Sequence, residues 1–168
     1  MSDVHIRLAE AADVPALCAL IFEHGPNPWN YLPEAQVRAH LQCIGAGEVE
    51  AVLAEHEGAT VGFVSFMPST AFARYQPADR CVATHGYICE AVVHRAMAGR
   101  GLGTQLLDRA VARLAERGLT DIYIDRHEEN RASAGMMRKA GFVEVETYLD
   151  PQRRSEGSRR TAVCYRQL

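Results

Sequence analysis

The sequence YICEAVVHRAMAGRGLGTQLL, residues 87–107, carries most of the information about the fold. Its apolar start predicts a buried strand over 87–94. Glycines follow at 99, 101 and 103, and a helical stripe then runs through Leu102, Leu106, Leu107, Ala110, Val111 and Leu114. Glycines before a helix let the backbone approach an anion, and the free N–H groups of the helix start point towards it. The stretch therefore predicts a pyrophosphate-binding loop, with an ordinary glycine-rich turn as the alternative.

The same periodicity, followed outward in both directions, predicts a mixed order of strands and helices. Strands are expected over 4–8, 48–55, 60–67, 87–94, 121–125, 142–149 and 161–168, with a hairpin turn at Glu57-Gly58. Helices are expected from an Asp13 cap to His24, over 33–44, from Leu102 to Gly118, and from an Asn130 cap to Gly141. This order is neither a regular alternation nor all-β, so it predicts an α/β (α+β) fold.

Length and composition exclude several classes of protein. The 168 residues suit a single domain, 1–168, and the net charge of −3 argues against a nucleic-acid partner. No apolar stretch approaches the ~20 residues that a membrane span needs, and residues 1–5 do not begin a secretion signal. The five cysteines are scattered without paired spacing, which is typical of reduced thiols in a cytoplasmic protein and predicts no metal site.

Two common nucleotide-binding loops fit the glycines poorly. A phosphate loop needs Gly-Lys-Ser/Thr, whereas Gly103 is followed by Thr104-Gln105. The dinucleotide fingerprint starts directly after its strand, but here the loop from Val93 is long. Asp125 ends the next expected strand, where an acid could bind a ribose, so a nicotinamide-dependent oxidoreductase stays open as an alternative.

Two blocks at the right separation resemble the GNAT superfamily of N-acetyltransferases. The family's cofactor motif, Arg/Gln-x-x-Gly-x-Gly/Ala after a strand ending in Val-x-Pro, is similar to Val93–Gly103. Its second block, Asn-x-x-Ala-x-x-Leu-Tyr-x-x-x-Gly-Phe, is similar to Asn130–Phe142, and Ile6–Asp13 resembles the family's opening strand and helix. The element order agrees throughout, so the resemblance covers essentially the whole chain.

The resemblance implies a GNAT-like fold with a splayed central sheet of about seven strands and about four helices. It implies acetyl-CoA as the acetyl donor, no metal, and direct attack on the acetyl group by an amine of a small molecule or peptide. Members of the family often form homodimers, so the resemblance also implies a second copy of this chain as a partner. The implied cofactor-binding residues are Ala91, Val92, Val93, Gly99, Arg100, Gly101, Leu102, Gly103, Thr104 and Asn130.

Three positions depart from the family pattern. Ala98 stands at the Arg/Gln position and Arg95 at the proline position, with Arg100 as a substitute source of positive charge. Met137 stands where many members carry a tyrosine that protonates the departing thiolate, and methionine has no proton to donate. These departures leave open a second function, a degenerate module that binds acyl-CoA without catalysis.

Glu90, three residues before Val93, is the predicted catalytic base, because an ammonium acceptor must lose a proton before it attacks. The alternative is a structural carboxylate. Substitute acids are Tyr87, Tyr123 and Tyr148, each also suited to packing. The loop residues Trp29 to Tyr31 are expected to wall the acceptor pocket. Four arginines at 153, 154, 159 and 160 suit either a solvated turn or a site for an acidic acceptor or cofactor phosphate.

Overall fold

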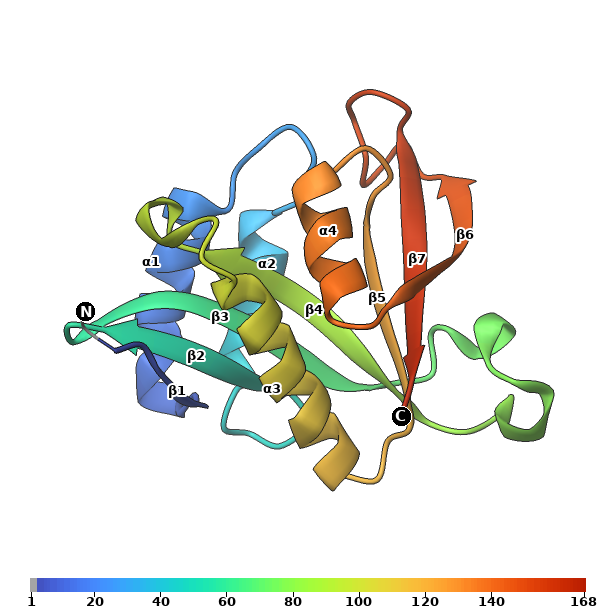
Figure 1. Cartoon of the computed structure of the whole chain (residues 1–168), viewed down its shortest axis with the longest axis horizontal. Helices are drawn as coiled ribbons and strands as arrows, with labels where there is room; N and C mark the ends of the chain where they lie inside the picture. Colours follow the sequence, from blue (N-terminus) through green and yellow to red (C-terminus); the bar gives the residue numbers. More distant parts are fainter. Residues whose placement is uncertain (1–2) are drawn as a thin grey trace.

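The computed structural model describes residues 3–168, so residues 1 and 2 of the expected domain lie outside the described residues. The chain forms a seven-stranded sheet in the order β1-β2-β3-β4-β5-β7-β6 (Figure 1). All neighbouring strands pair antiparallel except β4 and β5, which are parallel. The predicted mixed fold with seven strands and four helices is confirmed.

The observed elements lie within a few residues of the predicted ones. The strands are β1 His5–Leu8, β2 Glu50–His56, β3 Ala59–Ser69, β4 His85–Val93, β5 Asp121–His127, β6 Val143–Leu149 and β7 Arg160–Gln167. The helices are α1 Val14–His24, α2 Glu34–Gln42, α3 Leu102–Glu116 and α4 Arg131–Lys139, with short 3-10 turns at Ala11–Asp13, Ala73–Tyr75, Ala78–Arg80 and Arg95–Met97.

One predicted cap is wrong and two predicted turns are confirmed. The Asp13 side chain does not cap α1, because it accepts hydrogen bonds from the Arg7 guanidinium and from the Glu10 amide (2.7 Å). The ion pair with Arg7 holds the pKa of the Asp13 carboxyl below its usual value. Glu57 and Gly58 both have positive φ (52° and 79°), as a tight hairpin turn requires. Gly118 also has positive φ after α3.

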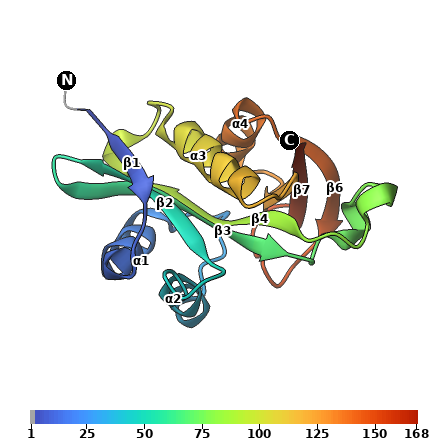
Figure 2. The same ribbon diagram turned by 90° about the horizontal axis from the view of Figure 1, so that it is seen from below.

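Each face of the sheet carries its own apolar core (Figure 2). Helices α3 and α4 cover one face, where the leucines of the predicted α3 stripe are at most 4 % exposed. Helices α1 and α2 cover the other face, packing Leu17, Ile21 and Leu41 against Phe63 of β3. The central strands are therefore buried on both sides, which explains their continuous apolar runs.

The sheet opens between β4 and β5. Only Gly86, Tyr87 and Ile88 of β4 pair with β5, so the strand from Cys89 to Val93 has no partner on that side among the residues that the structure describes. A bulge adds to the divergence, because Ser65 of β3 pairs with Glu90 while Phe66 pairs with Ile88, and Cys89 is the extra residue. The result is a wedge-shaped gap in the middle of the molecule, beside the glycine loop.

Candidate active site

The glycine loop has the backbone geometry that an anion site needs. Gly99 and Gly101 both have φ of 77°, a left-handed conformation that favours glycine, and a Cβ at either would meet no atom within 4 Å. The first hydrogen bond of α3 runs from the Gln105 amide to the Gly101 carbonyl (3.1 Å). The amides of residues 102–104 precede that ladder, so they are available to a ligand at the positive end of the helix dipole.

Two histidines in ring contact, His24 and His94, hold the start of this loop. The His94 Nδ1 accepts a hydrogen bond from the Ala96 amide (3.0 Å), and the His24 Nδ1 accepts one from the Arg95 amide (3.2 Å). The two rings lie 3.8 Å apart. His94 therefore has a structural role, and α1 helps to position the loop between β4 and α3.

The gap presents unpaired backbone from β4. The His94 amide donates to the Val61 carbonyl of β3 (2.8 Å), and backbone direction alternates along a strand. Ala91 and Val93 therefore turn their N–H and C=O groups towards the gap. Val92, which was predicted to bind the cofactor together with Ala91 and Val93, is oriented differently. Its backbone faces β3 and its side chain is buried against α1 and α2.

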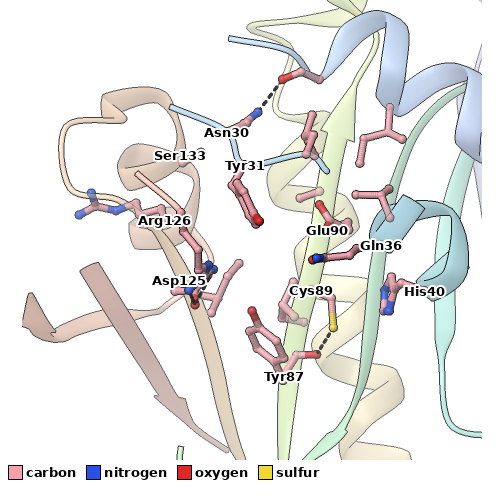
Figure 3. Close-up of a pocket in the computed structure, with 18 of the residues that line it drawn as sticks. Asn30, Tyr31, Gln36, His40, Tyr87, Cys89, Glu90, Asp125, Arg126 and Ser133 are labelled. Carbon is pink, nitrogen blue, oxygen red and sulfur yellow. Dashed lines mark hydrogen bonds and ion pairs between the residues drawn. The ribbon is translucent and has the colours of Figure 1, made fainter. Parts of the chain in front are cut away.

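A cavity of about 400 Å³ adjoins the gap on the α1–α2 side. Its walls come from the α1–α2 loop, α2, β4, β5, α4 and the loop before β7 (Figure 3). Glu90 and Ala91 line it, as do Asn30 and Tyr31 of the predicted acceptor wall. The glycine loop lies outside this cavity, so the donor and acceptor parts of the predicted site are adjacent rather than coincident.

Glu90 has the properties of a base at neutral pH. Its side chain points from β4 into the cavity (Figure 3). Its pKa is raised to about 7, mainly by burial and in addition by the Asp125 carboxylate, while Arg153 and Arg154 oppose the shift. The Glu90 amide donates to Ser65 Oγ (3.1 Å), which also lies 2.9 Å from His40 Nε2, so the strand is fixed where it bulges.

The structure separates the three candidate tyrosines. Tyr87 lines the cavity with its hydroxyl pointing inward (Figure 3), and burial raises its pKa well above the usual value. Tyr123 is fully buried and donates to Gln76 Oε1 (2.8 Å), and Tyr148 packs against the same aromatic cluster. Met137 lies in the cavity wall and is 4 % exposed. Cys89 also lines the cavity, but burial raises its thiol pKa, which disfavours a nucleophilic thiolate.

The arginine-rich loop before β7 lies in a different place from the solvated turn that its sequence suggests. Arg153 and Arg154 line the cavity and both approach Asp125, at 3.1 and 3.7 Å, so they do not belong to a solvated turn. Arg154 is 6 % exposed, and its Nε donates to Thr161 Oγ1 (2.9 Å). A run of arginines signals positive charge in the sequence, but the pattern does not reveal that this loop folds back over the sheet.

Asn130 is confirmed as the cap of α4, since its Oδ1 accepts a hydrogen bond from the Ser133 amide (3.2 Å). It also lines an open hollow shared with Trp29, whose ring packs 4.6 Å from that of His127. Trp29 therefore lies beside the start of α4 rather than in the main cavity. A role for Asn130 towards the cofactor stays a prediction.

The described residues contain no group of three or more His, Cys, Asp or Glu side chains that could hold a metal ion. Within residues 3–168, no helix has the length and apolar character needed to cross a membrane. All five cysteines are free.

The fold matches known acetyltransferase structures over almost its whole length. An acetyltransferase of the GNAT family from Streptococcus pneumoniae superposes with a TM-score of 0.75 at 20% identity, covering 99% of this chain and 100% of that chain. Ribosomal-protein-alanine N-acetyltransferase from Brucella melitensis gives 0.74 at 24% identity, covering 98% and 99%. The acetyltransferase yncA from Salmonella typhimurium, solved with its cofactor acetyl-CoA, gives 0.74 at 20% identity, covering 99% and 95%.

The sequence comparisons differ in reach. Searched against curated proteins, the sequence has no match. The model of the acetyltransferase (GNAT) family, in contrast, matches residues 14–142, a span that contains α1, the unpaired end of β4, the glycine loop and α4. The chain therefore belongs to the GNAT acetyltransferase family.

Proposed function

We propose that the protein transfers the acetyl group of acetyl-CoA directly to a primary amine. The overall reaction is R–NH₃⁺ + CH₃CO–SCoA → R–NH–COCH₃ + HS–CoA + H⁺. A nitrogen–carbon bond forms, the carbon–sulfur bond breaks, and the thiolate that leaves takes up a proton. The observation that carries the proposal is the Glu90 carboxyl, which faces the cavity from the strand that lines the gap.

The donor fits the groups that the chain presents beside the gap. The amides of residues 99–104 would hold the pyrophosphate, with Arg100 adding positive charge, and the space around Gly99 and Gly101 is free. The backbone of Ala91 and Val93 would pair with the amide-containing arm of the cofactor. Asn130 would contribute from the start of α4. Val92 would support this strand through its core packing.

Glu90 would remove the ammonium proton, directly or through a water molecule, because its pKa of about 7 leaves much of it ionised at neutral pH. The nitrogen would then attack the acetyl carbon. Tyr87 or water would protonate the departing thiolate, since Tyr87 is the one candidate tyrosine that lines the cavity and Met137 has no proton to give. The free cysteines and the donor suit a cytoplasmic enzyme, and a homodimer remains an expectation from the family.

Thermal denaturation with and without ligand tests the donor. Acetyl-CoA at a hundredfold excess over its Kd should stabilise the protein by about 2.7 kcal/mol, whereas NAD should have no effect. Release of free thiol from acetyl-CoA with a panel of primary amines then tests transfer. No shift at millimolar acetyl-CoA would overturn the proposal, and a shift with NAD alone would favour an oxidoreductase.

The buried position of Met137 in the cavity wall supports one second candidate, a module that binds acyl-CoA without turning it over. The same two measurements separate the candidates. A binding module would show the acetyl-CoA shift but release no thiol with any amine above the rate of the blank.

A further inference from the structure

The acceptor side of the cavity is roofed by two loops that bind each other. Arg154 of the loop before β7 donates from Nη1 to the Trp29 carbonyl of the α1–α2 loop (3.3 Å). The Asn30 side chain is tied back to the Gly25 carbonyl (2.7 Å), which stiffens the second loop. A long peptide chain would have to separate this contact to enter, whereas a small molecule of suitable size fits a cavity of about 400 Å³.

Arg153 places a partly free guanidinium in the cavity wall. Within residues 3–168 its hydrogen bonds use only the two terminal nitrogens: Nη1 and Nη2 face Asp125 at 3.1–3.3 Å, and Nη1 also approaches Asp150 at 3.4 Å. Asp125 lies across the end of the fork, so the edge formed by Nε and Nη2 is available. That edge matches the two oxygens of a carboxylate. The side chain is 33% exposed, so a ligand can reach it.

The other charged groups of the cavity leave little attraction for a polycation. The Arg126 guanidinium is engaged elsewhere, with the His127 and Glu128 carbonyls at 3.0 and 2.7 Å. The other ionisable groups that line the cavity are Tyr31, His40, Tyr87, Cys89, Glu90, Asp125, Arg153 and Arg154. Both arginines face Asp125, whose charge is thereby balanced, and His40 and Tyr87 are kept neutral by burial. An acceptor with several ammonium groups would therefore have one carboxyl with which to pair, that of Glu90.

We infer that the acceptor is a small amine that also carries a carboxylate, of the amino-acid type, with Arg153 binding the carboxylate and Glu90 facing the amine. This assignment rests on the proposed acetyl transfer. Arg153 and Glu90 line the same cavity of about 400 Å³, Arg153 from the loop before β7 and Glu90 from β4. The α-amino and α-carboxylate groups of one small molecule can therefore address both. Leu32, Val37 and Met67 supply an apolar wall for its side chain.

The test compares matched acceptors that differ only in the carboxylate. L-Methionine, L-methioninamide and 3-(methylthio)propylamine share the side chain, and kcat/KM is measured for each by thiol release. We expect the free acid to exceed the amide and the amine by about tenfold or more, since tenfold corresponds to about 1.4 kcal/mol. The amide has the less basic amine and is chemically easier to acetylate, so its deficit must come from binding. Equal or higher kcat/KM for the amide would overturn the inference.

Variants of Arg153 give the second arm. Arg153→Gln should remove the preference for the acid, measured as the ratio of kcat/KM for the acid to that for the amide, because any effect of the variant on Glu90 is shared by both acceptors. Arg153→Lys keeps the charge beside Asp125 without the planar fork, and should lose most of the preference even if Arg153→Gln folds poorly. Arg159→Gln is the matched control, since Arg159 is an exposed arginine of the same loop outside the cavity wall and its loss should not change the preference. Retention of the preference in both Arg153 variants would contradict the role of Arg153.

Binding in the absence of turnover separates this inference from the proposed function. With the protein saturated with CoA, L-methionine should raise the Tm of the wild type more than L-methioninamide does, and Arg153→Gln should abolish the difference. Acid-selective binding without thiol release would support the ligand class and contradict acetyl transfer. Thiol release without acid selectivity would support acetyl transfer and contradict the ligand class.

Discussion

At the scale of single residues, Glu90 determines how the rate should depend on pH. Glu90→Gln keeps the shape of the side chain but cannot accept the proton, so kcat should fall about 10²–10⁴-fold at pH 7. The wild-type rate should rise through an apparent pKa near 7, the value that burial gives this carboxyl, and the variant should lack that rise. The deficit should shrink above pH 9, where the acceptor deprotonates unaided. A pH–rate profile for both proteins measures this.

Binding of acetyl-CoA is the control for that variant, and it should stay unchanged because Glu90 faces the acceptor side. Full activity of Glu90→Gln from pH 6 to 9 would instead make Glu90 a structural carboxylate, and the base would then be water or another side chain.

Glu90 should also affect how the free energy of unfolding depends on pH. Its folded pKa of about 7 lies above the unfolded value of about 4.3, so the folded state binds the proton more tightly. The favourable contribution is fully present below pH 4 and is lost as pH rises through 7, where the protein carries a buried charge. Glu90→Gln should therefore gain about 1–3 kcal/mol of unfolding free energy relative to wild type between pH 4 and pH 8. Urea denaturation at both pH values checks it; parallel curves for the two proteins would refute it.

Met137 tests the source of the thiol proton. Its side chain is buried in the cavity wall, and tyrosine is larger and carries a hydroxyl that can donate. If no side chain has taken over the family's tyrosine, Met137→Tyr should raise kcat or leave it unchanged, with little effect on the Kd of acetyl-CoA. A large fall in kcat with the Kd unchanged would show that Tyr87 or water already serves and that the new ring displaces the acceptor. Met137→Leu, which changes volume little, is the matched control.

At the scale of elements, the glycine loop should respond to substitution in two separable ways. Gly101→Val forces a branched side chain into a left-handed conformation and into the space beside the helix start, so acetyl-CoA should no longer shift the Tm. Gly118→Val is the matched control, since Gly118 also has positive φ (83°) and open surroundings but lies at the far end of α3. It should lower stability by a similar amount and keep the acetyl-CoA shift. Loss of the shift in both variants would contradict a local effect.

Regular elements were predictable because their signals are local. The α3 stripe repeats at helical spacing, and Gly118 and Gly141 take the left-handed conformation that ends a helix. Asn130 likewise caps α4 through a neighbour three residues away. Asp13 has the same local signal, yet the Arg7 guanidinium, brought near by β1, competes successfully for its carboxylate. A local sequence pattern contains no information about a competing side chain from another element.

The candidate site was predictable on its donor side and much less on its acceptor side. Backbone amides and positive-φ glycines belong to one continuous stretch, so a motif can describe them. The acceptor wall joins Arg153 to Asp125 across 28 residues of chain and Arg154 to Trp29 across 125. Nothing in either segment alone encodes that meeting, and the arginines consequently resembled a solvated turn.

At the scale of the whole molecule, the sheet consists of two parts. They are joined at a narrow seam, the short parallel pairing of β4 with β5. β1 to β4 are packed between α1, α2 and α3, while β5, β7 and β6 carry α4 and the aromatic cluster around Tyr123 (Figure 2). Periodicity predicts the strands but not their order, so the parallel contact of β4 with β5 is known from the structure alone. The alternation of backbone direction then decides which strand residues would meet the proposed donor, and it separates Val92 from Ala91 and Val93.

The seam has a consequence for how the protein exchanges its amide hydrogens with solvent. In the absence of donor, the Ala91 and Val93 amides face the gap without a strand partner, so they should exchange rapidly although they lie in the middle of the sheet. The Val92 and His94 amides point to β3 and should exchange slowly, as an internal reference. Addition of CoA should slow Ala91 and Val93 selectively, as though an eighth strand had joined the sheet. In that sense the protein without donor has an incomplete sheet, which the proposed donor would complete in every catalytic cycle.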